Sequence, residues 1–176
     1  MSRLSPGDAF PALTVPRLGG GALALGRPDP ASGRDWAMLV VYRGKHCPIC
    51  ARYLKTLEGL LPRLHALGVD VAAVSGDPEE KAAAFAADNA LTLPVGFGLT
   101  PAQMAALGLW ISDPRSPQET DRPFPEPGVF VVNAEGRVQI MDVSNAPFAR
   151  PDLEALTNGI AFVREKGYPI RGTRAV

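Results

Sequence analysis

An unbroken apolar run, followed closely by two cysteines, constrains this chain more than any other feature. Residues 37–42 (Ala-Met-Leu-Val-Val-Tyr) show no alternation of polar and apolar side chains, which is typical of a strand buried on both faces at the centre of a sheet. Cys47 and Cys50 follow, and Pro48 lies between them at a position suited to the first turn of a helix. We therefore expect a C-x-x-C pair where a central strand passes into a helix.

The segment that begins at this pair has the periodicity of an amphipathic helix. Between Pro48 and Leu67, leucines recur at intervals of three and four residues, which places them on one helix face. Cys50 belongs to the same stripe, so we expect it to be the less accessible of the two thiols. The remaining pattern predicts further strands at 12–15, 22–25, 71–75, 93–95, 129–132 and 137–143, and helices that begin near residues 77, 100 and 151.

The order of these elements predicts an α/β fold. Strands and helices alternate first, and two strands joined by a turn come near the end, so parallel strands should precede an antiparallel pair. The expected architecture is a central mixed β-sheet flanked by helices on both faces. Residues 112–127 are rich in Pro, Ser, Asp and Arg and should form a long irregular loop. No repeat or linker divides the chain, so a single domain over residues 1–176 is expected.

Charge and hydropathy exclude several function classes. Eighteen Lys and Arg balance eighteen Asp and Glu, so no bulk positive charge favours nucleic acid or an anionic membrane surface. No apolar stretch approaches the roughly 20 residues of a membrane span, and residues 1–10 lack the apolar core of a signal peptide. We therefore expect a cytoplasmic protein. Two cysteines in that reducing compartment indicate redox chemistry or half a metal site rather than a disulfide framework.

A cysteine at a helix start is a candidate nucleophile, because the thiolate is the reactive form. First-turn N–H groups and the helix dipole favour negative charge there, and Arg43, Lys45 and His46 add cationic neighbours. Lowering the pKa from about 8.5 to about 6 requires about 3.4 kcal/mol and ionises about 90% of the thiol at pH 7. Cys47 is therefore expected to attack. Cys50 lies one helical turn on, within disulfide reach, and is expected to resolve the intermediate.

Three other interpretations of the pair stay open. The two residues can be ordinary reduced cysteines with no special environment. A zinc site would need four ligands, and among the soft donors only His46 and His65 supplement the cysteines. No metal and no cofactor is therefore expected. The pair can also belong to a redox-responsive binding module without turnover.

The residues around the pair resemble the thioredoxin superfamily, and more closely its AhpC/TSA-type, peroxiredoxin-like (redoxin) branch. Residues 42–50 (Y-R-G-K-H-C-P-I-C) match the R-G-x-x-C-P-x-C signature. Residues 5–11 and 18–20 resemble the N-terminal hairpin, and residues 130–137 resemble the F-hydrophobic-hydrophobic-D-x-x-G turn. The resemblance spans almost the whole chain and implies a thioredoxin-like fold. It also implies an antioxidant thiol peroxidase that reduces hydroperoxides and is restored by an external dithiol protein. A homodimer is frequent in this branch, although no apolar stripe here marks an interface.

Three positions depart from the peroxiredoxin pattern, P-x-x-x-T-x-x-C with a distant arginine. Val40 stands at the place of the proline, Gly44 at that of the threonine and Pro127 at that of the arginine. Pro127 resembles the cis-proline of thioredoxin-type oxidoreductases, so we expect a cis Glu126–Pro127 bond packed against the cysteines. Arg150 resembles a second arginine of peroxiredoxins. An equally weighted alternative is that Arg150 is a solvated residue near a helix start. These departures leave a second function open, thiol–disulfide exchange on protein disulfides.

Overall fold

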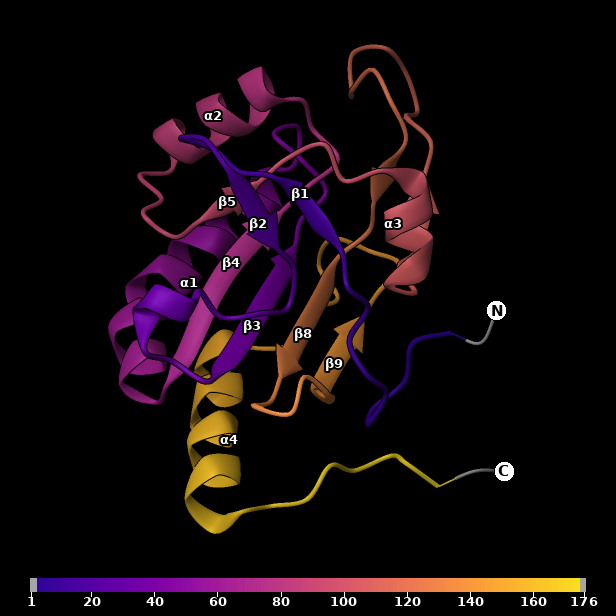
Figure 1. Ribbon diagram of the computed structural model, residues 1–176. Coiled ribbons are helices and arrows are strands. Elements are labelled where there is room, and N and C mark those ends of the chain that lie inside the picture. Colours follow the sequence, from indigo (N-terminus) through magenta and orange to yellow (C-terminus); the bar gives the residue numbers. More distant parts are fainter. Residues whose placement is uncertain (1–2, 175–176) are drawn as a thin grey trace.

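The computed structural model describes residues 3–174, and its centre is a five-stranded mixed sheet. Its strands are β3 (Trp36–Val41), β4 (Val69–Val74), β5 (Val95–Gly96), β8 (Gly128–Val132) and β9 (Val138–Val143). They lie in the order β5-β4-β3-β8-β9 (Figure 1). β3, β4 and β5 run parallel, β8 is antiparallel to β3, and β9 is antiparallel to β8. The predicted sequence of parallel strands and a final antiparallel pair is confirmed.

Helices and a two-stranded hairpin cover the two faces of this sheet. The helices are α1 (Pro48–Ala66), α2 (Glu79–Asp88), α3 (Pro101–Ala106) and α4 (Leu153–Lys166), and the hairpin strands are β1 (Thr14–Pro16) and β2 (Ala22–Ala24). α1 and α4 pack on one face, whereas the hairpin and α3 pack on the other (Figure 1). The predicted α/β class, with helices on both faces, is therefore confirmed. None of the helices described is long and apolar enough to span a bilayer.

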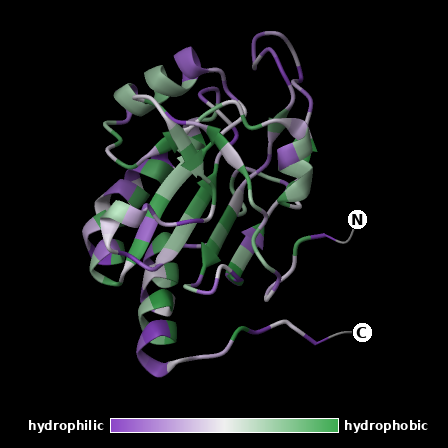
Figure 2. Cartoon of the chain, in the orientation of Figure 1, coloured by the Kyte–Doolittle hydropathy of each residue, from purple (hydrophilic) through white to green (hydrophobic). Residues whose placement is uncertain are grey.

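The buried side chains explain the two sequence patterns that predicted the fold. Five of the six residues of β3 are buried, as expected for a strand covered on both faces. The apolar stripe of α1 packs against the sheet and carries Cys50 into the core. Its buried leucines are Leu54, Leu57, Leu60, Leu61 and Leu64. Figure 2 shows the hydrophobic residues concentrated in the central strands and on the inward sides of the helices.

Capping signals mark helix ends correctly in two places. Thr100 and Gln103 form a capping box at the start of α3, in which each residue binds the backbone of the other. Asp152 caps α4, and its carboxylate accepts the N–H of Ala155 at 2.7 Å. α4 ends at Gly167, whose φ of 59° is a left-handed conformation that glycine adopts without a Cβ clash.

The segment between α3 and β8 is more ordered than its composition predicted. A long irregular loop was expected over 112–127, but β6 (Ile111–Ser112) pairs with β7 (Phe124–Pro125) in an antiparallel ladder. Each strand has only two residues, which is too short for a hydrophobic period to appear in the sequence. The residues between them, 113–123, form a loop that projects from the molecule (Figure 1).

Candidate active site

Cys47 caps the N-terminus of α1. Its backbone is extended, with φ −108° and ψ 100°, and its sulfur accepts the N–H of Cys50 at 3.2 Å. Oxygen-bearing side chains usually fill this role. Because a sulfur fills it here, negative charge on the sulfur meets the free N–H groups and the positive end of the helix dipole. Pro48 is the first helical residue, as predicted, and the Cys47 N–H donates to the Gly44 carbonyl at 3.1 Å.

Cys50 lies one turn into the same helix, and both cysteines are free thiols. The exposed fraction is 1% for Cys47 and 0% for Cys50. The expected difference in accessibility is therefore wrong, because the surrounding core covers both sulfurs. The two residues differ in their electrostatic surroundings instead.

The pKa values of the two thiols shift in opposite directions. The pKa of Cys47 is lowered to about 6, and the hydrogen bond from the Cys50 thiol is the main cause. Burial opposes this shift. The Cys50 backbone N–H and Arg43 lower the pKa further. Burial raises the pKa of Cys50, and its hydrogen bond to Cys47 raises it further. A thiol donates a hydrogen bond and a thiolate accepts one. The negative charge of the pair therefore lies on Cys47.

Arg43 is a cation that acts on Cys47, and a buried carboxylate holds it in place. Its guanidinium lowers the pKa of the Cys47 thiol. Its Nε lies 3.1 Å from Glu126 Oε2, and its guanidinium carbon lies 4.8 Å from the centre of the Phe124 ring. Glu126 is buried and also accepts the Ser112 hydroxyl at 2.7 Å. Glu126 was predicted only as the neighbour of Pro127, so its pairing with Arg43 was missed.

Arg150 contacts the other thiol. Its Nη2 lies 2.8 Å from Cys50 Sγ, and its Nε donates to the Pro147 carbonyl at 2.7 Å. The guanidinium also lies over the ring of Tyr53, 5.0 Å from the ring centre. The alternative of a solvated arginine is therefore wrong. The charge of Arg150 also lowers the pKa of Cys47, which it does not contact through a hydrogen bond among those of the described residues.

Gly44 stands where the peroxiredoxin pattern has a threonine, and its backbone explains why a threonine is absent. Its φ of 139° is strained for any residue with a Cβ, and a Cβ would lie 2.9 Å from Asp77 Oδ1. The helix expected to begin near residue 77 is α2, which starts at Glu79 with Pro78 at the N-cap position, so Asp77 lies outside it. The Asp77 carboxylate accepts the N–H of Lys45 at 2.7 Å and so supports the loop that leads into Cys47. The position of Asp77 in the loop that follows β4 was the only signal for this role.

The predicted cis bond before Pro127 is wrong, because no peptide bond among the described residues is cis. The segment around Pro127 is extended, and backbone hydrogen bonds join it to a neighbouring segment on each side. The Glu126 N–H donates to the Trp110 carbonyl at 2.8 Å, and the Ser144 N–H donates to the Pro127 carbonyl at 3.1 Å. The feature that linked Pro127 to thioredoxin-type disulfide exchange is therefore missing.

His46 does not act as the cationic neighbour that the sequence suggested. Burial lowers its pKa and Arg43 lowers it further, so the imidazole is neutral near pH 7. Its ring packs against Phe124 with 4.6 Å between ring centres, and both ring nitrogens are buried without a partner. Within residues 3–174, no three His, Cys, Asp or Glu side chains gather as metal ligands would.

Two open clefts meet at Arg43. One has a volume of about 740 Å³ and the other about 400 Å³, and both are lined by Arg43, Arg115 and Glu119. Lys81 ties the loop 113–123 across the larger cleft through an ion pair of 2.7 Å with Asp121. A small molecule that enters either cleft reaches Arg43, the residue whose guanidinium lowers the pKa of the Cys47 thiol.

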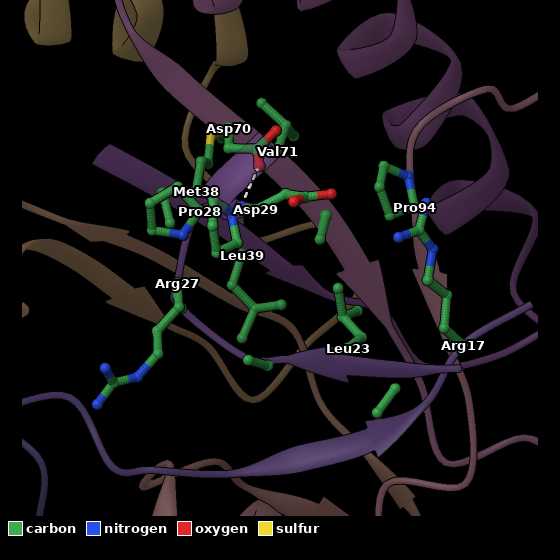
Figure 3. A pocket seen from close by; sticks show the side chains of 16 residues that line it. Arg17, Leu23, Arg27, Pro28, Asp29, Met38, Leu39, Asp70, Val71 and Pro94 are labelled. Carbon is green, nitrogen blue, oxygen red and sulfur yellow. Dashed lines mark hydrogen bonds between the residues drawn. The ribbon is translucent and has the colours of Figure 1, made fainter. Parts of the chain in front are cut away.

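A more enclosed cavity of about 200 Å³ lies between the hairpin β1–β2 and the sheet (Figure 3). It forms where the facing side chains are small. These small residues are Ala22, Ala24, Gly26, Ala37 and Ala72. Arg17 and Arg27 also line it. None of its lining residues belongs to the thiol site.

The fold and the thiol pair together define a thioredoxin-like protein: a mixed sheet flanked by helices, with a C-x-x-C pair where the central strand β3 leads into α1. The model of the AhpC/TSA family matches residues 6–141. The chain therefore belongs to the AhpC/TSA family, as the sequence resemblance implied.

Solved structures of peroxiredoxins share this fold. A mutant of peroxiredoxin 6 from Arenicola marina matches with a TM-score of 0.74 and 17% identity, over 94% of this chain and 76% of that one. A peroxiredoxin-like protein from Aquifex aeolicus matches with a TM-score of 0.75 and 17% identity, over 93% and 90% of the two chains. Peroxiredoxin Q from Xanthomonas campestris matches with a TM-score of 0.66 and 17% identity, over 93% of this chain and 96% of that one. A search of curated proteins gave no significant match.

The opposite pKa shifts predict unequal alkylation of the two thiols. At pH 6.5 about three quarters of Cys47 is thiolate, whereas Cys50 is almost entirely protonated. We expect iodoacetamide to label Cys47 at least tenfold faster, at a rate that rises with pH around a midpoint near 6. Peptide mass mapping measures both rates, and the unfolded chain, in which the thiols should react alike, is the control. Equal labelling of the folded protein, or faster labelling of Cys50, would contradict the charge assignment.

Proposed function

We propose that this protein is a thiol-dependent peroxidase that reduces hydroperoxides. The observation that carries the proposal is the paired thiol site, in which the Cys47 sulfur caps the start of α1 and accepts the N–H of Cys50 from one turn away at 3.2 Å. Cys47 is the attacking residue and Cys50 the resolving residue. Membership of the AhpC/TSA family supports this assignment.

The proposed cycle has three steps. The Cys47 thiolate attacks the terminal peroxide oxygen, so that an S–O bond forms, the O–O bond breaks and an alkoxide or hydroxide leaves and takes a proton. Cys50 then attacks the Cys47 sulfenic acid, which forms an S–S bond and releases the sulfenic oxygen as water. An external dithiol protein reduces the disulfide by thiol–disulfide exchange and restores both thiols.

Arg43 is the residue best placed to assist the first step. Charge develops on the departing oxygen, and preorganised donors that meet such charge commonly contribute 10²–10³ in rate. Arg43 lowers the pKa of the Cys47 thiol, is fixed by Glu126 and Phe124, and lines both clefts. We therefore propose that the peroxide approaches along its guanidinium. Because Cys47 is 1% exposed, a shift of the covering side chains has to accompany entry.

Thiol–disulfide exchange on protein disulfides is the alternative use of the same two cysteines. The trans bond before Pro127 removes one of the features that favoured it, whereas Gly44, which offers a peroxide no side-chain donor, remains. The C-x-x-C motif serves either reaction, and membership of the AhpC/TSA family favours peroxide reduction.

The test compares peroxide and disulfide reduction in one protein. Reduced wild-type protein is mixed with hydrogen peroxide or an organic hydroperoxide, and consumption is followed with a thioredoxin-type recycling system; insulin reduction is measured in parallel. We expect peroxide consumption that Cys47→Ser abolishes, and slow insulin reduction. If insulin reduction is fast while wild-type peroxide consumption equals that of Cys47→Ser, the protein is a disulfide oxidoreductase and the proposal is wrong.

A further inference from the structure

The position of Arg150 against Cys50 is fixed by several independent contacts. Its Nε donates to Pro147, its guanidinium stacks on Tyr53, and the Tyr53 hydroxyl donates to the Pro151 carbonyl at 2.8 Å. These contacts hold Nη2 2.8 Å from Cys50 Sγ. A charged donor at this distance is strongly attractive to a thiolate and only weakly to a thiol.

The positive charge of Arg150 is not neutralised by a carboxylate. Among the described residues, no Asp or Glu forms an ion pair with it. Arg43, by contrast, is paired with Glu126 at 3.1 Å. Nη1 of Arg150 is also buried and without a partner, so the guanidinium retains unused donor capacity. Within the described part of the chain, Cys50 is therefore the one side chain that accepts a hydrogen bond from this guanidinium.

Cys47 and Arg150 change the pKa of the Cys50 thiol in opposite directions. Burial raises the pKa of Cys50 and the hydrogen bond to Cys47 raises it further, while Arg150 lowers it. Arg43 and Tyr42, the residue that follows β3, also interact with the thiol electrostatically. As long as Cys47 is a thiolate, a second negative charge on Cys50 is strongly disfavoured. When Cys47 becomes a neutral sulfenic acid, that repulsion disappears and Arg150 remains.

We propose that Arg150 is a catalytic residue of the resolving step, which stabilises the Cys50 thiolate once Cys47 has been oxidised. This inference rests on the proposed function. In the step, Cys50 loses its proton and attacks the Cys47 sulfur; the S–S bond forms, the S–O bond breaks, and the departing hydroxide takes a proton to give water. The hydroperoxide consumed in the first step is the oxidant. The two arginines thus serve successive steps, Arg43 at Cys47 and Arg150 at Cys50.

The first experiment tests the pairing without any peroxide. In the Cys47→Ser background a neutral hydroxyl replaces the thiolate, and Cys50 is the only thiol. We expect Arg150→Met to slow alkylation of Cys50 by iodoacetamide about tenfold at each pH below the titration midpoint of Cys50. The rate for Arg150→Lys should lie between those of Arg150→Met and the protein that retains Arg150. Arg52→Met removes an exposed charge two residues from Cys50 and should change nothing. Unchanged alkylation in the folded Arg150→Met and Arg150→Lys proteins would overturn the inference, whatever the protein does to peroxide.

The second experiment separates the two steps in the two-cysteine protein at pH 8.5, where Cys47 is fully ionised. One equivalent of hydrogen peroxide is added, and dimedone quenching followed by mass spectrometry gives the sulfenic acid and the disulfide over time. We expect Arg150→Met to leave the oxidation of Cys47 unchanged and to slow disulfide formation about tenfold. Normal disulfide formation would overturn the inference. Slower alkylation in the first experiment, with no oxidation of wild-type Cys47 here, would refute the proposed function while the Arg150–Cys50 pairing stands.

Discussion

Cys50→Ser is expected to abolish repeated turnover of peroxide in the presence of a recycling reductant. Cys47 of this variant should still react once with peroxide at close to its normal rate. A serine hydroxyl can donate to the Cys47 thiolate as the thiol does, and this donation is the largest cause of the low Cys47 pKa. Serine cannot, however, form the S–S bond. The Cys47 sulfenic acid therefore persists, and excess peroxide carries it to sulfinic acid.

Two measurements and one matched variant check this result. Stopped-flow mixing gives the rate of the first oxidation, and peroxide consumption with a thioredoxin-type recycling system gives the turnover. Cys50→Ala removes the hydrogen-bond donor as well, so it should raise the Cys47 pKa and slow the first oxidation at pH 6.5, which Cys50→Ser should not. Sustained turnover by Cys50→Ser would show that the external reductant acts directly on the sulfenic acid and that Cys50 does not resolve it.

The parts of this molecule that were predictable depend on local sequence. The buried strand β3, the helix start at Pro48 and the leucine stripe of α1 each follow from residues within one or two turns of each other. These elements suffice to place Cys47 at a helix N-terminus. The same reasoning named helix dipole and nearby cations as the causes of a low Cys47 pKa. It missed the Cys50 thiol as the main donor, because the direction of a hydrogen bond between two thiols depends on which one is deprotonated.

The parts that were not predictable depend on contacts between distant segments. Asp77 follows β4 and supports the loop before Cys47 across 32 residues, and Arg150 reaches Cys50 across 100 residues. Neither contact leaves a periodic trace in the sequence. The cis Pro127 bond was inferred by analogy with related proteins, and the hydrogen bonds of this segment to its neighbours are made by an extended trans chain instead.

Arg43→Met is expected to lower the second-order rate constant for oxidation of Cys47 by about 10²–10³. This is the usual loss when one well-placed donor to developing charge is removed, and Gly44 supplies no side chain that could replace it. Arg43 has two separable effects, since it also lowers the pKa of Cys47. At pH 6.5 the variant should lose both the thiolate and the stabilisation of the departing oxygen.

Measuring the rate constant from pH 5.5 to 9.5 separates these two effects. Once the pH is well above the Cys47 pKa of each protein, both are fully ionised, so any remaining deficit reports on the transition state alone. We expect that deficit to persist, and Arg43→Lys to recover part of it because a lysine keeps the charge but not the planar donor geometry. Arg137→Met, in the β8–β9 turn at the opposite end of the sheet, is the matched control and should match wild type. If the Arg43→Met rate rises to the wild-type plateau at high pH, Arg43 acts only by ionising Cys47, and the departing oxygen is stabilised by another group.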